Sequence, residues 1–297
     1  MDVAAALLAR ARAIGATSLA VVGTSKNAGK SVVTAALAEA LGVAGAPYAL
    51  CSIGRDGEAA DALDASPKPR FLLRPGAVVA TAAALLPRSP ALEILDVTRE
   101  NSALGPIVLA RVRVPASIEI AGPPTARALR RIVRALATFA PIVLVDGAVD
   151  RLAALRGGDD AIVVAVGAAG AATMEHAVDD VAALVARLRL PLVDAGEESL
   201  RVAGALTAAD AAAFVRAGET RQIIVHDATH VTFGGRAFLA LAARLRLRCE
   251  VALHPVACTV APRGVERAFE PRAFARAVAL RTGLPVYDVY ASTESVA

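Results

Sequence analysis

Residues Gly23 to Ser31 read GTSKNAGKS and combine glycines, lysines and hydroxyl groups at nearly the spacing of a phosphate-binding loop. The apolar run Leu19–Val22 before them predicts a strand, and the alanine-rich pattern from Val32 onward predicts a helix. At such a turn, backbone amides of the loop and of the first helical turn converge on one anion site, which the helix dipole also favours. The segment therefore predicts a phosphate site.

Individual residues of this loop have separate roles toward a nucleotide. Gly29 lets the backbone approach a phosphate, Lys30 places its ammonium on the β- and γ-phosphates, and the Ser31 hydroxyl ligates Mg²⁺. Only three lysines occur in the sequence, and two of them, Lys26 and Lys30, lie in this loop. A compact point charge suits a phosphate cradle better than a planar guanidinium does. We predict that the whole loop binds the nucleotide, namely Gly23, Thr24, Ser25, Lys26, Asn27, Ala28, Gly29, Lys30 and Ser31.

The loop departs from the standard Walker A pattern in one respect. The pattern places its first glycine at position 24, which is Thr24 in this sequence. The glycine here is Gly23, one position earlier. This spacing resembles the loops of dethiobiotin synthetase and cobyrinate amidases, which belong to the deviant P-loop class. Many dimeric members of that class carry a further lysine five residues before the Walker lysine, and Ser25 occupies that place here. A lysine acting across a dimer is therefore not supported, and a homo-oligomer is left open.

A carboxylate follows a second apolar run. Asp146 comes directly after Ile142–Val145, which is the Walker B arrangement, in which a carboxylate at a strand's end holds a Mg²⁺-bound water. An acid at this place is also common in ordinary turns, so the loop upstream is what favours a metal role for Asp146. Asp150, one turn further on, is better explained as a helix cap.

A third candidate is Asp56 in the segment Gly54–Glu58, which directly follows the second predicted strand. In deviant P-loop proteins an aspartate in this region senses the γ-phosphate or orients the attacking water. We predict that Asp56, together with Lys30, is catalytic, although surface turns also collect such residues.

The spacing His226-Asp227-x-x-His230 is that of a zincin metal site, which requires a helix to place both histidines on one face. Here the motif follows the strand-like run Ile223–Val225, so we expect no zinc site of that kind. Asp227 would instead line a cleft in the C-terminal part of the chain.

Composition excludes several classes. The 297 residues carry a net charge of +4, yet only 3% are aromatic and none is tryptophan, so stacking platforms for nucleic acid are scarce. The basic stripe of Arg127, Arg130, Arg131 and Arg134 is better explained as a solvated helix face. No apolar run is long enough to span a membrane, and no secretory signal is recognised, so we expect a soluble cytoplasmic protein. Three cysteines without a C-x-x-C pair predict buried thiols.

The elements that must position these residues alternate between strand and helix. Helices are predicted at Val3–Ala13, from Val32 to Ala40 and at 77–86, 173–188, 207–217, 236–246 and 272–281, with the arginine-striped helix after Pro124. Strands are predicted at Leu19–Val22, 48–53, 92–97, 107–114, 142–145, 161–166, 223–225, 251–256 and 286–290. This alternation predicts an α/β fold with a doubly wound, mostly parallel sheet of P-loop NTPase type. We expect a nucleotide-binding domain over residues 1–196 and a smaller α/β domain over 197–297, with a seam at Gly196–Gly204.

The choice of base follows from a motif that the sequence lacks. Guanine-specific switches of this class read the base with an [NT]-K-x-D segment, and the only lysine beyond the loop is Lys68, between Pro67 and Pro69. We therefore expect ATP with Mg²⁺ rather than GTP.

Five segments together resemble a subunit of the lysine 5,6-aminomutase reactivase. They are GTSKNAGKS, SIGRDGE after the second strand, SIEIAGP at 117–123, LVDGAVDR at 144–151, and TVAPRG before FEP near Phe269. The resemblance implies an ATP-driven, chaperone-like partner of an adenosylcobalamin- and pyridoxal-phosphate-dependent mutase. It also implies a second ATPase subunit and a role in exchanging damaged cobalamin.

Two other functions fit the loop. One is an ATP-dependent ligase in the manner of dethiobiotin synthetase or the cobyrinate amidases, which would need a carboxylate-binding pocket that the sequence does not locate. The other is a nucleotide-binding module without turnover, because Asp56 is a single candidate for the hydrolytic residue.

Overall fold

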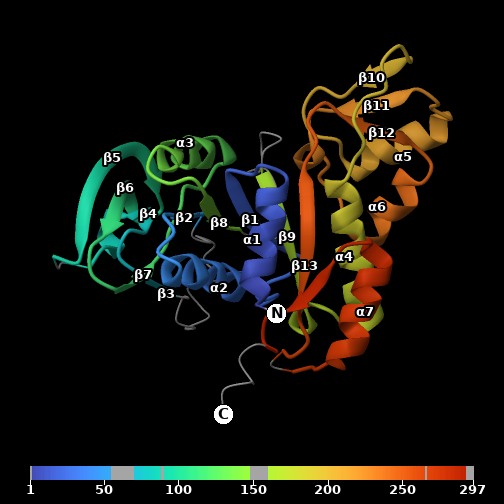
Figure 1. Ribbon diagram of the computed structural model, residues 1–297. Coiled ribbons are helices and arrows are strands. Elements are labelled where there is room, and N and C mark those ends of the chain that lie inside the picture. The colour runs from blue at the N-terminus through green and yellow to red at the C-terminus, as the bar shows by residue number, and fades with distance from the viewer. Residues whose placement is uncertain (1, 55–69, 88–89, 148–159, 265, 292–297) are drawn as a thin grey trace. The chain divides into compact units, whose positions relative to one another are not determined.

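The computed structural model describes residues 2–54, 70–87, 90–147, 160–264 and 266–291 (Figure 1). The chain forms two compact units. The first unit comprises Met1–Val22 and Lys30–Ala148, and the second comprises Gly23–Gly29 and Val149–Ala297. The division into domains of residues 1–196 and 197–297 stays a prediction.

The first unit is built on a mixed sheet in the order β1-β8-β2-β4-β6-β5. Strands β1, β8, β2 and β4 run parallel, while β6 and β5 form an antiparallel hairpin attached to β4. A separate antiparallel pair joins β3 to β7. The strands are β1 (Ser18–Gly23), β2 (Ala49–Ser52), β3 (Arg70–Leu73), β4 (Val78–Ala82), β5 (Leu92–Ser102), β6 (Gly105–Val112), β7 (Ala116–Glu119) and β8 (Val143–Asp146).

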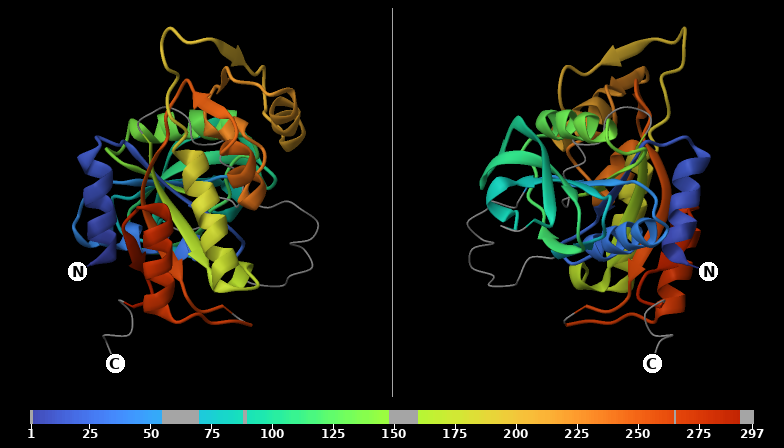
Figure 2. Two further views of the ribbon diagram at one scale, coloured as in Figure 1. Left: turned by 90° about the vertical axis from the view of Figure 1, so that its right-hand side faces the viewer. Right: turned by 60° about the vertical axis from the view of Figure 1, so that its left-hand side comes forward.

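Helices cover both faces of this sheet. The helices of the first unit are α1 (Val3–Ala13), α2 (Lys30–Val43) and α3 (Ala126–Ala137). Figures 1 and 2 place α2 and α3 on opposite sides of the strands. Every residue of β1 is buried, as expected for a parallel strand covered on both faces.

The sequence of α3 explains how it sits on the sheet. Thr125 caps its first turn, since the Thr125 hydroxyl accepts a hydrogen bond from the Ala128 amide. Leu129, Ile132 and Leu136 recur at helical spacing and are buried. The arginine stripe lies on the other face, where Arg131 pairs with Glu100 of β5.

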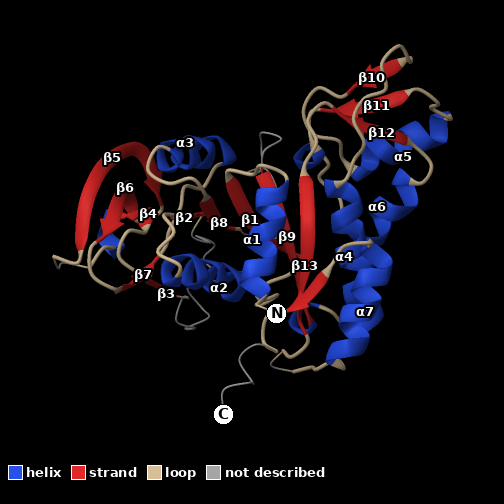
Figure 3. Cartoon of the chain, viewed as in Figure 1, coloured by secondary structure: helices blue, strands red, loops and turns tan. Residues whose placement is uncertain are grey.

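The second unit contains two groups of parallel strands. One has the order β14-β13-β9 and the other the order β10-β11-β12. The strands are β9 (Asp160–Gly167), β10 (Ser199–Arg201), β11 (Gln222–Val225), β12 (Arg246–Cys249), β13 (His254–Ala261) and β14 (Val286–Asp288). The helices are α4 (Met174–Leu188), α5 (Ala208–Ala217), α6 (Gly235–Ala242) and α7 (Pro271–Thr282). Helices α4 and α7 pack side by side, and α6 packs on α4 (Figures 2 and 3).

Both units are therefore α/β with mostly parallel sheets, which confirms the predicted class. Most predicted elements are present within a few residues of their expected ends. The helix Val3–Ala13 matches, and the predicted pair 92–97 and 107–114 forms the antiparallel hairpin β5-β6.

Three expectations about local structure are wrong. The predicted helix at 77–86 is strand β4 followed by a short 3-10 turn at Ala83–Leu85, because Val78 and Val79 are buried between β2 and β6 and pair on both sides. The strand predicted at 251–256 lies further along the chain, because β13 begins at His254 and continues to Ala261. The strands β3, β7, β10 and β12 were not expected, since each has only three or four residues, too few to establish a period in the sequence.

No helix in the described part of the chain has both the length and the apolar character that crossing a membrane requires. All three cysteines are free and buried, as the sequence predicts.

Candidate functional site

In the first unit, strand pairing brings Ser31 and Asp146 together. β1 and β8 are adjacent and parallel, and their register pairs Val21 with Asp146, so both strands end at the same edge of the sheet. Helix α2 begins with Lys30 and Ser31. Ser31 Oγ donates a hydrogen bond of 3.0 Å to Asp146 Oδ2. The structure thus joins the two residues that the sequence proposes as metal ligands.

Thr34 is a further partner of this carboxylate. Its Oγ1 lies 3.1 Å from Asp146 Oδ1 and 3.1 Å from the backbone oxygen of Lys30, so its single proton is shared between two acceptors. Thr34 is fully buried. Sequence reasoning missed it, although its position three residues after Ser31 places it on the same face of the helix.

Burial and local hydrogen bonds act in opposite directions on Asp146. Burial raises the pKa of this carboxyl, while the hydrogen bonds from Ser31 and Thr34 and the positive charge of Lys30 lower it, and burial has the larger effect. The oxygen donors of Ser31 and Asp146 are the kind that Mg²⁺ prefers. The residues present therefore fit the magnesium site that the sequence predicts, in which Ser31 and Asp146 would hold the metal.

Two glycines, Gly147 and Gly122, let backbone segments near Asp146 approach one another closely. The Gly147 amide donates to the Val21 oxygen at 3.0 Å, and a Cβ at Gly147 would lie 2.6 Å from that same oxygen. A Cβ at Gly122 would lie 1.6 Å from the Ser52 oxygen. Both positions therefore require glycine.

The segment that carries Asp56 begins next to this edge. The Ile53 amide donates to the backbone oxygen of Asp146 at 3.2 Å, and the Gly54 amide donates to the backbone oxygen of Pro123 at 2.8 Å. Asp56 itself lies outside the described residues, as do Asp150 and Lys68.

In the second unit, Gly23–Gly29 lies against the end of β9. The Thr24 amide donates to the Ala165 oxygen at 3.1 Å. A Cβ at Gly167 would lie 3.0 Å from Ala28 Cα, and one at Gly170 would lie 2.1 Å from Ser25 Oγ. Gly167 and Gly170 therefore leave no room for a side chain where they meet the loop.

The loop itself adopts left-handed backbone conformations at two positions. Asn27 has φ 60° and Gly29 has φ 90°, which explains an asparagine and a glycine there. A Cβ at Gly29 would lie 3.5 Å from Ala261 Cβ and 3.6 Å from the Tyr290 hydroxyl. Lys26 and Asn27 are exposed, while Ala28 is buried.

A pocket of about 450 Å³ lies in the second unit. Arg187 of α4 lines it and is only 6% exposed, and its Nη1 donates to the backbone oxygens of Val231 and Phe233 at 3.3 and 3.2 Å. The other lining residues are Thr24, Asp180, Leu184, Thr229, Val231, Thr232, Gly234 and Gly235. Sequence reasoning did not find this pocket, and the one available signal was an arginine on the apolar face of α4.

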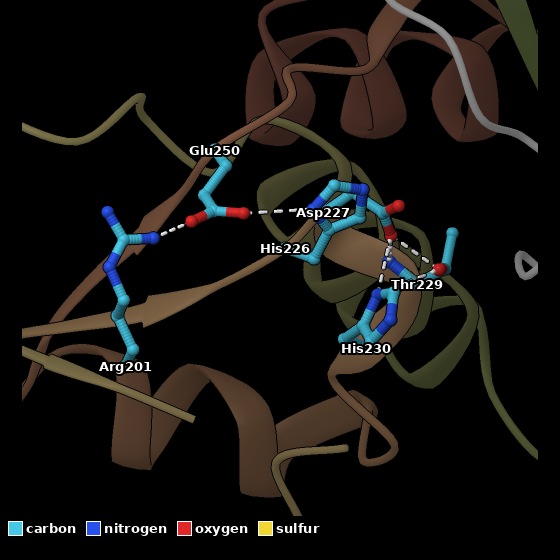
Figure 4. Close-up of polar contacts among 6 residues, drawn as sticks. All are labelled: Arg201, His226, Asp227, Thr229, His230 and Glu250. Atoms are coloured by element: carbon cyan, nitrogen blue, oxygen red, sulfur yellow. Dashed lines mark hydrogen bonds and ion pairs between the residues drawn. The ribbon is translucent and has the colours of Figure 1, made fainter. Parts of the chain in front are cut away.

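Polar side chains gather at the carboxyl ends of β10, β11 and β12 (Figure 4). We call this group the carboxyl-edge cluster. It comprises Arg201, His226, Asp227, Thr229, His230 and Glu250. His230 lies in the three-residue 3-10 turn Ala228–His230, so the zincin spacing does not lie on an α-helix, as predicted. Within the described chain, no group of three or more His, Cys, Asp or Glu side chains is arranged to hold a metal ion.

Comparison of this chain with protein-family models, with curated proteins and with solved structures finds no match.

Proposed function

We propose that this chain binds ATP with Mg²⁺ through the loop Gly23–Ser31 and hydrolyses it. The observation that carries the proposal is the 3.0 Å hydrogen bond from Ser31 Oγ to Asp146 Oδ2. A hydroxyl from the first turn of the helix after the loop and a carboxylate from the adjacent parallel strand are the two groups that hold Mg²⁺ in P-loop NTPases. Their contact supports a shared role that neither residue alone would suggest.

The proposed roles of the residues follow from their chemistry. Amides of the loop and of the first turn of α2 bind the phosphates, and the Lys30 ammonium offsets their negative charge. Ser31 and Asp146 hold Mg²⁺, which supplies further positive charge to the phosphates when bound. Asp56 orients the attacking water, a role that rests on the sequence alone.

We further propose, from the resemblance of the five sequence segments, that the chain is a subunit of a lysine 5,6-aminomutase reactivase. ATP would then bias a conformational change that opens the mutase and lets damaged cobalamin leave. A second ATPase subunit and the mutase would be its partners in the cytoplasm, and no contact with nucleic acid or a membrane is proposed.

The pocket of the second unit supports a second candidate, an ATP-dependent ligase. Thr24 belongs to the loop and lines this pocket, and Arg187 brings a buried guanidinium to it. A guanidinium is suited to a carboxylate substrate. Asp180 also lines the pocket, so the substrate of such a ligase would carry a donor group as well as an acid.

Calorimetry of ATP·Mg²⁺ binding tests the nucleotide site. Lys30→Ala should weaken binding by at least about 100-fold, or about 2.7 kcal/mol, because a point charge on the phosphates is lost. Lys68→Ala is the control, since Lys68 is the one lysine of the sequence that lies outside this loop, and this variant should retain the affinity. Unchanged affinity in a folded Lys30→Ala variant would overturn the assignment.

Reactivation of an inactivated mutase separates the two functions. With ATP, the partner subunit and fresh adenosylcobalamin, the chain should restore activity to lysine 5,6-aminomutase, and its ATP and ADP forms should bind the mutase differently, by about 1–3 kcal/mol. Equal or absent binding in both states, together with ATP-dependent phosphorylation of a small carboxylate or amine, would favour the ligase.

A further inference from the structure

One wall of the pocket in the second unit is a stripe of side chains on helix α4. Asp180, Leu184 and Arg187 all line the pocket and follow one another at spacings of four and three residues, so they share one face of the helix. The stripe offers a carboxylate, then an apolar side chain, then a guanidinium. α4 rises about 10 Å over these seven residues, so the two charged residues stand two turns apart.

Two glycines of a second segment lie close to both charged groups. Gly234 and Gly235, at the start of α6, also line the pocket. A Cβ at Gly234 would lie 3.7 Å from Arg187 Nη1, and a Cβ at Gly235 would lie 3.4 Å from Asp180 Oδ1. Because both residues are glycine, this segment adds no side chain to the space in front of the guanidinium and the carboxylate.

The guanidinium of Arg187 is held in a fixed orientation. The residue is 6% exposed, and its Nη1 donates to the backbone oxygens of Val231 and Phe233 at 3.3 and 3.2 Å. A long side chain that is already fixed loses little freedom when it binds a ligand. Guanidinium groups donate hydrogen bonds and pair best with planar oxyanions such as carboxylates. The Arg187 end of the pocket therefore favours an acid.

The remaining polar side chains of the pocket accept hydrogen bonds. Thr229 donates its hydroxyl proton to Asp227 Oδ1, and Thr232 donates its own to the backbone oxygen of Leu206 at 3.2 Å. A hydroxyl has one proton and two lone pairs, so each of these oxygens can only accept from a ligand. Together with the carboxylate of Asp180, these hydroxyls favour a ligand group with several N–H donors, such as a protonated amine.

We propose that this pocket binds an amino acid whose amine and carboxylate are separated by a short methylene chain. The amine lies at Asp180, the methylenes lie against Leu184, and the carboxylate lies at Arg187. The cavity of about 450 Å³ is of the size that small-molecule sites have. Hydrogen bonds take about 3 Å at each end of a stripe about 10 Å long, which leaves about 4–5 Å between the charged groups of the ligand. 4-Aminobutyrate has this span.

The ligand would lie beside the phosphate loop, because Thr24 of that loop also lines the pocket. Its use as the substrate of a ligase rests on the proposed function, whereas its binding rests on the pocket itself.

Calorimetric titration of the full chain with a series of aminoalkanoates, from glycine to 8-aminooctanoate, tests the proposal. Affinity should be greatest near 4-aminobutyrate. Butyrate and butylamine, which each lack one charged group, should bind about 10- to 100-fold more weakly. A steady rise of affinity with chain length would show that methylene burial alone drives binding and would overturn the proposal. The absence of binding throughout the series would also overturn it.

Two substitutions assign the two ends of the ligand. Asp180→Asn should remove the preference for 4-aminobutyrate over butyrate, and Arg187→Met should remove the preference over butylamine. Since Arg187 is buried, Arg187→Lys replaces Arg187→Met if the latter does not fold, and it should weaken the preference because the fork of donors is lost. Asp179→Asn is the matched control, because this neighbouring carboxylate of α4 pairs with Arg236 and Arg281 and does not line the pocket.

The preference is a ratio of two affinities, so a general disturbance of the pocket would change both affinities and leave the ratio in place. An unchanged ratio in a folded Asp180→Asn variant would overturn the proposal. Circular dichroism of each variant excludes unfolding as the cause.

ATP binding, measured on the same samples, distinguishes this inference from the proposed function. Binding of 4-aminobutyrate by a chain that does not bind ATP would support the inference and contradict the proposed function. Intact ATP binding without binding of any aminoalkanoate would do the reverse.

Discussion

Ser31 Oγ donates a hydrogen bond of 3.0 Å to Asp146 Oδ2, although the two residues are 115 positions apart in the chain. The pairing of β1 with β8 makes this contact possible, because it sets the ends of both strands at one edge.

Replacing Asp146 should separate stability from metal binding. Burial raises the pKa of Asp146, so the ionised form, which is populated as the pH rises through that pKa, costs stability. Asp146→Asn removes the charge, and its melting temperature should equal or exceed that of wild type by a few degrees. The Mg²⁺-dependent part of ATP affinity should fall by about tenfold or more. A clear loss of melting temperature would show that the carboxylate is chiefly structural.

Ser31 and Thr34 contact the same carboxylate but should respond differently to substitution. Ser31→Ala should reduce the Mg²⁺ dependence of ATP binding, since this hydroxyl is the proposed ligand. Thr34→Val should leave that dependence in place and lower the free energy of unfolding by about 1–3 kcal/mol, because it strips a buried hydroxyl from two acceptors. Calorimetry at several Mg²⁺ concentrations and denaturant unfolding measure the two effects. Equal Mg²⁺ behaviour in both variants would contradict the distinction.

Asp56 offers a test of hydrolysis. Asp56→Asn should keep nucleotide affinity and lose phosphate release by roughly 100-fold or more, the scale of losing a positioned catalytic group. Single-turnover phosphate release measures this loss, with Asp61→Asn, five residues further along the chain, as the control. A wild-type rate of phosphate release in Asp56→Asn would show that Asp56 has no role in hydrolysis.

Gly122 should tolerate no side chain. A Cβ there would lie 1.6 Å from the Ser52 oxygen and 2.5 Å from its carbonyl carbon, so the backbone must move. We expect Gly122→Ala to lose about 3 kcal/mol or more of unfolding free energy, at the upper end of single substitutions. Gly42→Ala is the control, because its nearest neighbours are side-chain atoms of Arg74 at 2.9–3.2 Å and not backbone atoms, and because alanine favours the helix. Equal stabilities in denaturant would disprove the steric argument.

The cysteines should be unreactive in the folded protein. Burial raises the pKa of Cys249 to about 11 and that of Cys258 to about 12, and it also raises the pKa of Cys51. At pH 8 a thiol of pKa 12 is about 10⁻⁴ ionised, and the thiolate is the nucleophile. A colorimetric thiol reagent should therefore label all three only after unfolding in guanidinium. Fast labelling of the native chain would contradict their burial.

The sequence predicted the class of fold and the pair of Ser31 and Asp146 because both rest on local signals. An apolar run followed by glycines and a helical pattern specifies a strand, a loop and a helix without knowledge of the rest of the chain. Residues 77–86 show where prediction from local signals fails. Their alanines favour a helix, yet pairing of β4 with two neighbouring strands outweighs that preference.

Sites that depend on long-range packing could not be predicted. Arg187 reaches backbone oxygens more than 40 positions away, and no periodic pattern encodes such a contact. The carboxyl-edge cluster likewise requires the order β10-β11-β12, and β10 is only three residues long. Three residues are too few to show the alternation by which a strand is predicted from sequence.

The closeness of Tyr290 to Gly29 gives the loop an optical reporter. The chain has no tryptophan and three tyrosines, so excited tyrosines have no indole to pass their energy to. Tyr48 is fully buried, whereas the Tyr290 hydroxyl would lie 3.6 Å from a Cβ at Gly29. Tyrosine emission of the unmodified protein should therefore respond when the loop takes up a ligand, and Tyr290→Phe should remove that response.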